Sequence, residues 1–166
     1  MPGAGGRKII MRYIITGHRL SKLSNYNTNW IKNEIDQLVM FRAECVGPDG
    51  TSHQITLGYS GMASGVDLWF CEACLAEKVP YIACVPFENQ GDTMSDGERT
   101  QRERLIASAK EVKSVRNSFM VEHCDVAIVV WDGNKGGTHN VLQQLVEKRK
   151  DFYWINPVKE VTWRCF

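Results

Sequence analysis

Short apolar segments alternate with amphipathic ones along most of this chain. Apolar runs rich in β-forming residues, typical of buried strands, occupy residues 12–17, 53–59, 81–87, 125–131 and 153–156. Helical spacing of apolar residues follows or separates them, at residues 30–41, 66–75, 98–113, 115–124 and 139–150. This alternation predicts an α/β three-layer sandwich, in which a mostly parallel sheet carries helices on both faces.

The first long helix has the clearest boundaries and face. A polar stretch, Ser21 to Asn29, is expected to be a loop, and Asn27 or Thr28 is expected to cap the helix behind it. One face of that helix is apolar and is formed by Ile31, Ile35, Leu38 and Val39. The sequence Gly47-Pro48-Asp49-Gly50 then breaks the chain before the second strand.

Length and composition indicate one globular domain. With 166 residues, 43% of them hydrophobic, the chain is long enough to bury a core. We expect a flexible tail at residues 1–10 and a single domain over residues 11–166. No apolar run approaches the ~20 residues that span a bilayer, and no signal-peptide pattern begins the sequence. A cytoplasmic protein without a membrane partner is therefore expected.

Charge and cysteine usage narrow the function classes further. A formal net charge of +1 argues against nucleic acid as a partner, because nucleic-acid-binding domains are usually basic. The six cysteines are scattered, so reduced thiols are expected. Cys71 and Cys74 form a C-x-x-C, but no second pair at zinc spacing accompanies them, so no metal is predicted.

Three predicted strands end in glycine-bearing turns. These turns are Thr16-Gly17-His18-Arg19, Ser60-Gly61-Met62-Ala63-Ser64-Gly65 and Asp132-Gly133-Asn134-Lys135-Gly136-Gly137-Thr138. In a parallel sheet all three lie at the carboxyl edge, where open α/β folds bind ligands, and two of them open helices. A phosphate- or nucleotide-binding crevice is the leading interpretation, and plain βα connections that need small residues are the alternative. The G-x-G-x-x-G and G-x-x-x-x-G-K-[ST] fingerprints are both absent, which disfavours an ordinary NAD enzyme or ATPase.

Five segments, in order, resemble one superfamily. The segment from Gly61 to Asp67 is similar to the S-G-[ML]-A-x-G-[IV]-D turn of the SLOG superfamily, which includes DprA/Smf and YpsA-like proteins. The likeness to YpsA-like members extends to Thr16–Arg19, Val85–Gln90, Arg116–Glu122 and Trp131–Asn140. The resemblance implies a Rossmann-like domain that recognises nucleotides or nucleotide-derived ligands. It leaves open whether the chain is a sensor, a phosphoribohydrolase or a binder of single-stranded DNA.

Chemistry assigns roles to individual residues of these turns. Backbone N–H groups of Gly61–Gly65 and Gly136–Thr138 are expected to face phosphates, while Arg19 and Arg116 are suited to bidentate phosphate pairing. Asp67 or Asp132 is a candidate acceptor for a ribose hydroxyl. The alternative for Asp67 is a helix cap, and the alternative for Arg116 and Asn117 is a structural tie between a helix and the sheet edge. The candidate ligand-binding residues are Gly17, His18, Arg19, Ser60, Gly61, Met62, Ala63, Ser64, Gly65, Asp67, Asn89, Arg116, Asn117, Asp132, Gly133, Gly136, Gly137, Thr138 and Asn140.

Catalysis is less favoured than binding. Phosphoribohydrolases of the LOG type carry P-G-G-x-G-T-x-x-E, and alignment of Gly137-Thr138 with that G-T places Val141 where the glutamate stands. An N-glycosidase would then need another acid or base, such as Asp67, Glu72, Glu88 or Glu122. We therefore expect a nucleotide-derived small molecule as the partner, with no bound cofactor. Trp30, Trp69, Phe119 and Tyr153 exceed what one small core needs, which favours a homo-oligomer.

Overall fold

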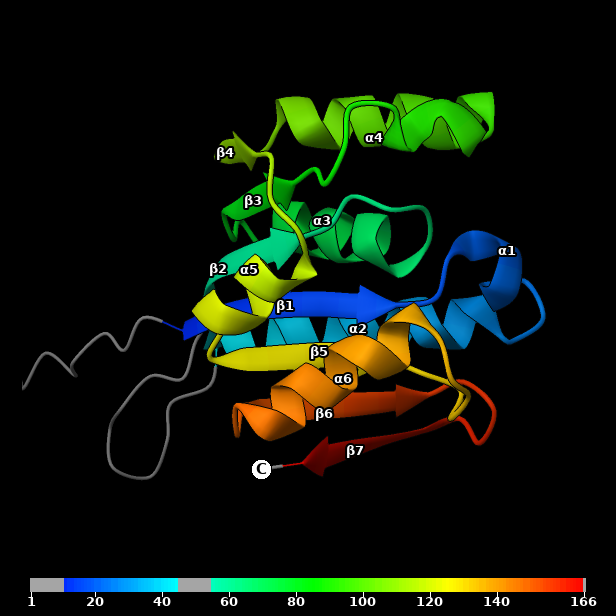
Figure 1. Ribbon diagram of the computed structural model, residues 1–166, viewed down its shortest axis with the longest axis vertical. Helices are drawn as coiled ribbons and strands as arrows, with labels where there is room; N and C mark the ends of the chain where they lie inside the picture. Colours follow the sequence, from blue (N-terminus) through cyan, green and yellow to red (C-terminus); the bar gives the residue numbers. More distant parts are fainter. Residues whose placement is uncertain (1–10, 45–54, 166) are drawn as a thin grey trace, which may run out of the picture.

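A computed structural model of the chain describes residues 11–44 and 55–165. Four of the sequence-based expectations lie outside the described residues: the tail at residues 1–10, the state of Cys45, the break at Gly47–Gly50 and the first residues of the strand from His53. The described part is an α/β structure built on one seven-stranded sheet, and it has the Rossmann-like arrangement of a mostly parallel sheet between helical layers (Figure 1).

The sheet has the strand order β4-β3-β2-β1-β5-β6-β7. Its strands are β1 (Met11–Gly17), β2 (Ile55–Ser60), β3 (Tyr81–Cys84), β4 (Glu111–Lys113), β5 (Val126–Val130), β6 (Asp151–Asn156) and β7 (Val161–Cys165). All neighbouring pairs are parallel except β6 and β7, which are antiparallel. The strand order reverses between β1 and β5, so the carboxyl ends of these two strands flank the expected ligand crevice.

The helices divide between the two faces of the sheet. They are α1 (Leu20–Leu23), α2 (Thr28–Glu44), α3 (Val66–Ala76), the 3₁₀ turn η1 (Gln90–Thr93), α4 (Asp96–Ala107), α5 (Asn117–His123) and α6 (Gly137–Glu147). Side chains of α2, α3 and α4 share one buried cluster with the sheet, and side chains of α5 and α6 share the other. Figure 1 shows the corresponding layers, with α5 and α6 in front of the sheet and α2 behind it.

Strand β1 shows how the sequence produces these two clusters. Tyr13 and Ile15 point into the α2–α3–α4 cluster, while Ile14 between them points into the α5–α6 cluster. Successive strand residues face opposite sides, so a strand covered on both faces must be apolar throughout. β5 follows the same rule, since all five of its residues are buried.

The predicted first long helix is confirmed, with a small change at its start. Asn27 caps it, because the Asn27 Oδ1 accepts a hydrogen bond of 3.1 Å from the Trp30 N–H. Ile31, Ile35 and Val39 are fully buried on the predicted face. The preceding stretch is not all loop, however, since α1 occupies Leu20–Leu23 within it.

The predicted helix over residues 98–113 is wrong in its second half. Helix α4 ends at Ala107, and residues 111–113 instead form the edge strand β4 beside β3. The charged, exposed sequence of β4 carries no alternating apolar pattern, which explains why the helical reading extended through it. The strand expected to reach Phe87 ends at Cys84, and β6 begins at Asp151, two residues earlier than expected.

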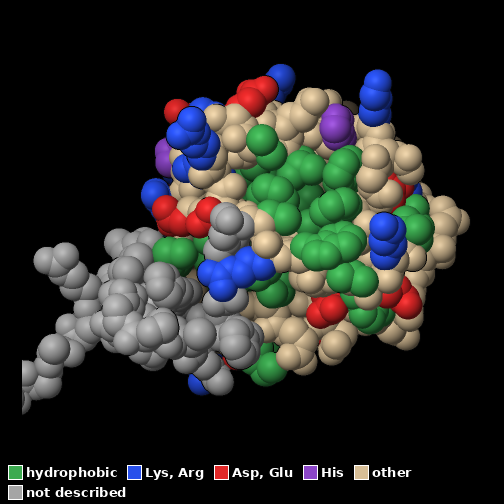
Figure 2. Space-filling model, turned by 90° about the horizontal axis from the view of Figure 1, so that it is seen from below, with side chains coloured by type: hydrophobic (Ala, Val, Ile, Leu, Met, Phe, Trp, Pro, Cys, Tyr) green, Lys and Arg blue, Asp and Glu red, His purple; other side chains and the backbone are tan. Residues whose placement is uncertain are grey.

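The antiparallel strand β7 escaped prediction and completes the sheet beside β6. Trp154 of β6 stands opposite Trp163 of β7, and their rings lie 4.7 Å apart. On the other side Trp154 meets Trp131 at 5.3 Å, so three indoles form a series across the sheet edge. Figure 2, seen from below the view of Figure 1, shows hydrophobic side chains gathered on this side of the molecule.

The four aromatic residues that favoured an oligomer have places within one subunit. Tyr153 is buried, and Trp30 and Trp69 pack against the larger cluster. Phe119 packs against the smaller one and stacks on His123. The aromatic count therefore carries no argument for assembly.

Candidate functional site

The three glycine-bearing strand exits meet in one cavity of about 800 Å³, here called the central crevice. It lies at the carboxyl ends of the central strands, as the sequence predicts. Its lining residues come from the exits of β1, β2, β3 and β5, from the start of α5 and from α6. They are Ile15, Thr16, Gly17, His18, Arg19, Gly61, Ala63, Asp67, Cys84, Pro86, Phe87, Gln90, Val115, Arg116, Asn117, Ser118, Gly137, Thr138 and Gln144.

The turn after β2, residues 60–67, is held by its own hydrogen bonds and is here called the packed turn. The buried Ser60 hydroxyl donates to the Asp67 carbonyl at 2.9 Å and accepts from the Met62 N–H at 3.2 Å. The Asp67 Oδ2 accepts from the Ala63 N–H at 3.1 Å. Since the Met62 and Ala63 N–H groups already have partners inside the turn, they are not free donors for a ligand.

A buried arginine braces the packed turn from behind. The Arg102 Nε donates to the Met62 carbonyl at 3.2 Å, and its Nη2 donates to the Gln90 Oε1 at 2.9 Å. The Gln90 Nε2 in turn donates to the Gly61 carbonyl at 2.8 Å. Met62 sits at a φ of 58°, an uncommon value for a residue other than glycine, and the bond to its carbonyl helps to hold it there.

Gly65 in the same turn is required by backbone conformation and by packing. Its φ is 91°, and a Cβ at this position would lie 2.9 Å from the His18 carbonyl oxygen and from the Leu20 N. Gly17 is likewise required by packing, because a Cβ there would lie 2.5 Å from the Val66 side chain. These two glycines let the β1 exit and the start of α3 approach each other closely.

The turn after β5, residues 132–138, is packed less tightly and is here called the open turn. It also contains a glycine of positive φ, Gly133 at 94°, but its glycines have open space around them. A Cβ added at Gly133, Gly136 or Gly137 would meet nothing within 4 Å. Helix α6 begins at Gly137 without a side-chain cap, so its first N–H groups have no intrahelical partner. Gly137 and Thr138 line the central crevice, and these N–H groups therefore offer donors beside it.

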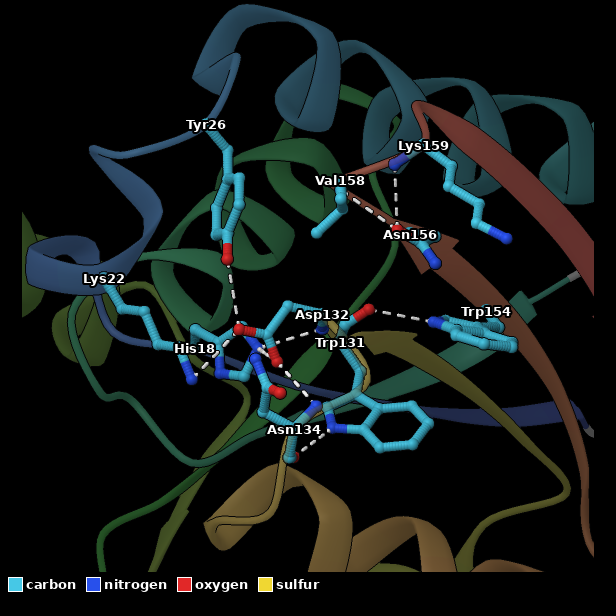
Figure 3. Close-up of polar contacts among 10 residues, drawn as sticks. All are labelled: His18, Lys22, Tyr26, Trp131, Asp132, Asn134, Trp154, Asn156, Val158 and Lys159. Carbon is cyan, nitrogen blue, oxygen red and sulfur yellow. Dashed lines mark hydrogen bonds and ion pairs between the residues drawn. The ribbon is translucent and has the colours of Figure 1, made fainter.

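Asp132 fastens the open turn to the β1 exit (Figure 3). Its side chain is 1% exposed, and its Oδ2 accepts from the Lys22 ammonium and from the Tyr26 hydroxyl, both at 3.1 Å. Its Oδ1 accepts from the Asn134 N–H at 3.0 Å and lies 3.2 Å from the His18 Nε2. Burial by itself would raise the pKa of Asp132, but the bonds from Asn134 and Lys22 outweigh it and hold that pKa well below its ordinary value. The carboxylate therefore holds the open turn against the β1 exit, and it does not line the crevice.

Asp67 is the titratable group whose environment points to chemistry. It lines the central crevice, and burial raises the pKa of this carboxyl to about 7, against the opposing effects of the Ala63 N–H and the Arg19 guanidinium. A carboxyl with such a pKa near neutral pH is a recognised mark of functional sites, although packing alone produces it as well. Cys84 also faces the crevice, but burial raises its pKa to about 12 and leaves it an inert thiol.

The candidate residues named from the sequence fall into three groups. Those that line the central crevice are Gly17, His18, Arg19, Gly61, Ala63, Asp67, Arg116, Asn117, Gly137 and Thr138. Ser64 and Asn89 line a neighbouring cavity instead. Those that line neither cavity are Ser60, Met62, Gly65, Asp132, Gly133, Gly136 and Asn140.

Several crevice residues were missed by the sequence analysis as individual candidates. Pro86, Phe87 and Gln90 lie within a segment that carried the family resemblance, so a signal for them existed in the sequence. Gln144, on the second turn of α6, carried no signal and enters the crevice because α6 runs beside it. Within residues 11–44 and 55–165, no group of three or more His, Cys, Asp or Glu side chains is arranged to hold a metal ion.

The thiols and helices of the described part complete the picture. Cys71 and Cys74, the C-x-x-C pair, are both buried, and the five cysteines in the described part are free. The Cys71 Sγ lies 3.6 Å from the Met62 Sδ, so this pair belongs to the packing behind the packed turn. None of the described helices combines the length and apolarity that crossing a membrane requires.

Comparison with known proteins identifies the class of fold. No protein-family model and no curated sequence matches this chain. Among solved structures, DprA of Helicobacter pylori, a single-stranded DNA-binding protein, superposes with a TM-score of 0.58 at 16% identity over 87% of this chain. DprA of Streptococcus pneumoniae gives the same TM-score of 0.58 at 12% identity over 87% of this chain. The molybdenum cofactor carrier protein of Chlamydomonas reinhardtii gives 0.54 at 15% identity, over 88% of this chain and 76% of that one.

These neighbours share the mostly parallel α/β, Rossmann-like fold of this chain. The chain spans 64% of the Helicobacter DprA chain and 50% of the Streptococcus one, so the larger proteins contain parts with no counterpart here. At these identities the likeness extends to the fold. The resemblance to the SLOG superfamily and to its YpsA-like members rests on the sequence motifs.

Proposed function

We propose that this protein binds a nucleotide-derived small molecule in the central crevice, acting as a sensor or a sequestering protein. The ligand class is ADP-ribose-like, cyclic or mononucleotide. The observation that carries the proposal is Gly137 at the crevice wall, where neither backbone strain nor packing calls for a glycine. Close approach of a ligand phosphate to the first N–H groups of α6 gives this glycine a reason.

Two cations lie where such a phosphate needs them. Arg19 and Arg116 both line the crevice, from the β1 exit and from the residue before α5, and both are exposed. Among the described residues, the Arg116 guanidinium has neither a hydrogen-bond nor an ion-pair partner, so a purely structural tie to the sheet edge receives no support. A free guanidinium beside helix N–H donors is suited to bidentate phosphate binding.

The structural neighbours are compatible with more than one ligand. The Chlamydomonas protein carries the molybdenum cofactor, a small molecule, and the Helicobacter protein binds single-stranded DNA. The near-zero net charge of this chain favours the small molecule, because strand binding depends on many phosphate contacts.

The test is a thermal-shift and calorimetric screen against mononucleotides, cyclic nucleotides and ADP-ribose, with an unlabelled single strand as a separate arm. Arg116→Met should lower the affinity of a bound nucleotide by about tenfold or more, the cost of one bidentate charged contact. Lys148→Met removes one positive charge at the far end of α6 and should leave the affinity unchanged. A screen without any nucleotide binding would refute the proposal, and salt-sensitive strand binding would replace it with the DNA-binding alternative.

A second candidate function, an N-glycosidase acting on nucleotides, is favoured by one observation. Asp67 presents at the crevice a carboxyl whose pKa is raised to about 7, the range in which a general acid or base works best. Against it, Val141 at the position of the LOG glutamate is buried in the α5–α6 cluster and leaves no carboxylate there. Release of free base from a nucleotide panel, abolished in Asp67→Asn, would establish this activity, and unchanged chromatograms would remove it.

A further inference from the structure

A second cavity adjoins the central crevice and is here called the side lobe. It measures about 700 Å³ and is formed by α1, the packed turn, the segment after β3 and the start of α4. Its lining residues are Arg19, Leu20, Ser21, Ser24, Ala63, Ser64, Phe87, Asn89, Gln90, Asp92, Thr93, Met94, Ser95 and Glu98. Four of them, Arg19, Ala63, Phe87 and Gln90, also line the central crevice, so the two cavities meet along one boundary.

The two cavities differ in the balance of their charges. In the central crevice Arg19 and Arg116 accompany the free N–H donors of α6 and outnumber its one carboxyl, Asp67. In the side lobe the carboxylates are Asp92 and Glu98, and the one cation that lines it is Arg19, at the boundary. An anionic group therefore prefers the crevice, and the acidic end of the side lobe opposes a second one.

Uncharged polar groups make up most of the remaining side-lobe wall. They are the hydroxyls of Ser21, Ser24, Ser64, Thr93 and Ser95 and the amide of Asn89. Leu20, Met94 and the half-exposed Phe87 add apolar surface between them. Hydroxyls, an amide and carboxylates interspersed with apolar patches suit a neutral ligand group that carries several hydroxyls, as a sugar does.

The boundary between the cavities is rigidly built. Gln90 is fixed from two sides, by the Arg102 guanidinium at 2.9 Å and by the Gly61 carbonyl at 2.8 Å. Arg102 is 8% exposed, and among the described residues no carboxylate lies within ion-pair distance of it. A buried guanidinium that is bonded only to neutral oxygens leaves positive potential directly behind this boundary. A linking phosphate there would meet that potential together with the Arg19 guanidinium.

We infer that the side lobe is a subsite for an uncharged, hydroxyl-rich group esterified to the ligand phosphate, so that the preferred ligand is a nucleoside diphosphate sugar rather than a plain nucleotide. The inference rests on the proposed function, since the phosphate must occupy the central crevice for its substituent to reach the side lobe. The sugar extends past Arg19 and Gln90 and exchanges its hydrogen bonds with water for those of the lobe. A free terminal phosphate in its place meets Asp92 and Glu98 without a partner.

Two pairs of probes, ADP with ADP-ribose and UDP with UDP-glucose, test this inference by calorimetry. Within each pair the members differ by one sugar on the terminal phosphate, and the ester bond to that sugar also removes one of the ionisable oxygens of the phosphate. We expect the sugar-bearing member of at least one pair to bind about tenfold tighter, a difference of about 1.4 kcal/mol. Equal affinity within both pairs, or tighter binding of the plain diphosphates, would overturn the inference and leave the proposed function standing. Absence of binding by all four would instead refute the proposed function.

A substitution that fills the side lobe tests whether the sugar binds there. Thr93 lines the side lobe only, and Thr93→Trp places an indole in that volume. We expect it to abolish the advantage of the sugar-bearing probe while the affinity for the plain diphosphate stays within about twofold, below the size of one hydrogen bond. The matched control is Thr100→Trp. Thr100 is exposed like Thr93, but it belongs to α4 and lines neither cavity, so this variant should retain the advantage of the sugar-bearing probe. Loss of both affinities in parallel in Thr93→Trp, with the fold intact by circular dichroism, would contradict a separate subsite.

Discussion

The packed turn and the open turn both contain glycine but differ in how tightly they are packed. Both follow a buried strand, both contain at least two glycines, both include a glycine of positive φ and both open a helix. In the packed turn Gly65 has a positive φ and tight neighbours, and side chains of the protein hold the donors at Met62 and Ala63. In the open turn the glycines meet nothing, and the donors at the start of α6 are free. Glycine content alone therefore does not distinguish a turn that must fit the protein from one that must admit a ligand.

This contrast changes which of the two turns is expected to offer backbone N–H groups to a ligand. The segment Gly61 to Asp67 carries the more specific family motif, yet its backbone is engaged within the protein. Its contribution to the crevice comes through Gly61, Ala63 and the Asp67 carboxyl. The open turn supplies the free N–H groups at Gly137 and Thr138, which under the proposed function are the donors for a ligand phosphate.

The largest expected effect concerns Asp67 in the packed turn. Its pKa in the folded protein is raised to about 7, above that of an unfolded aspartate, so the folded state holds a proton that the unfolded state releases. Stability should therefore fall as the pH rises from about 4 to about 7 and stay level above, and Asp67→Asn should remove this loss. The variant should match the wild type near pH 4 and exceed it at pH 8, by at most about 4 kcal/mol at 1.36 kcal/mol per pKa unit.

Urea unfolding at a series of pH values measures this difference. Asp151→Asn, an exposed carboxylate at the start of β6, serves as the control and should run parallel to the wild type. Parallel profiles for Asp67→Asn and the wild type would show that the carboxyl is not held in its neutral form.

Gly65→Ala should be the most damaging glycine substitution in either turn. A left-handed φ for alanine costs about 1–2 kcal/mol, and the contacts at 2.9 Å add about 1–3 kcal/mol of overpacking. We expect a loss of about 3 kcal/mol in the free energy of unfolding. Gly97→Ala lies within α4 with open space around it and should be neutral or slightly stabilising. A small effect at Gly65 would mean that the β1 exit and the packed turn separate easily.

Asp132→Asn tests the polar contacts that position the open turn. The substitution weakens the bonds from Lys22 and Tyr26 and leaves the Lys22 ammonium without its counter-charge. We expect a loss of about 2 kcal/mol, the usual size for a charged hydrogen bond. The pKa of Asp132 lies well below its ordinary value, so the stabilisation should persist in the wild type down to strongly acid conditions. Urea midpoints at neutral pH, with Asp96→Asn on the surface as control, measure it.

Gly137→Ala should separate binding from stability. Because a Cβ here meets nothing, the free energy of unfolding should change by less than about 0.5 kcal/mol. Under the proposed function the same methyl group lies where a phosphate approaches the α6 N–H groups, so the affinity for nucleotide should fall by about tenfold, or about 1.4 kcal/mol. An unchanged affinity would assign the open turn no part in ligand binding.

The sequence was most informative where buried strands and amphipathic helices repeat a regular pattern. The strands around β1 and β5, and the face of α2 formed by Ile31, Ile35 and Val39, could be predicted because burial on a given face forces a given period. Strands β4 and β7 could not, since they lie at the edges of the sheet, where partners on one side alone decide their conformation.

The candidate site was predictable in its location but not in its detailed contacts. Parallel strands bring their exits to one edge of the sheet, so the sequence alone predicts that Gly17, Gly61 and Gly137 lie together, as they do in the central crevice. Lys22 and Tyr26 bind the Asp132 carboxylate, and Arg102 donates a hydrogen bond to Gln90. These contacts join segments that are distant in sequence. No local pattern encodes such pairings, so Asp132 was interpreted as a ligand contact and Gln90 was overlooked.

The series of three tryptophans bears on the fluorescence of the protein. Trp131 directly precedes the open turn, donates through its Nε1 to the Asn134 carbonyl at 2.7 Å and stacks with His139 in the first turn of α6. Trp154 and Trp163 continue the series with tilted rings. The emission of an indole responds to its hydrogen bond and to the polarity around its ring. Under the proposed function Trp131 is thus an intrinsic fluorophore beside the segment that contacts the ligand phosphate, and its emission should report crevice occupancy without a label.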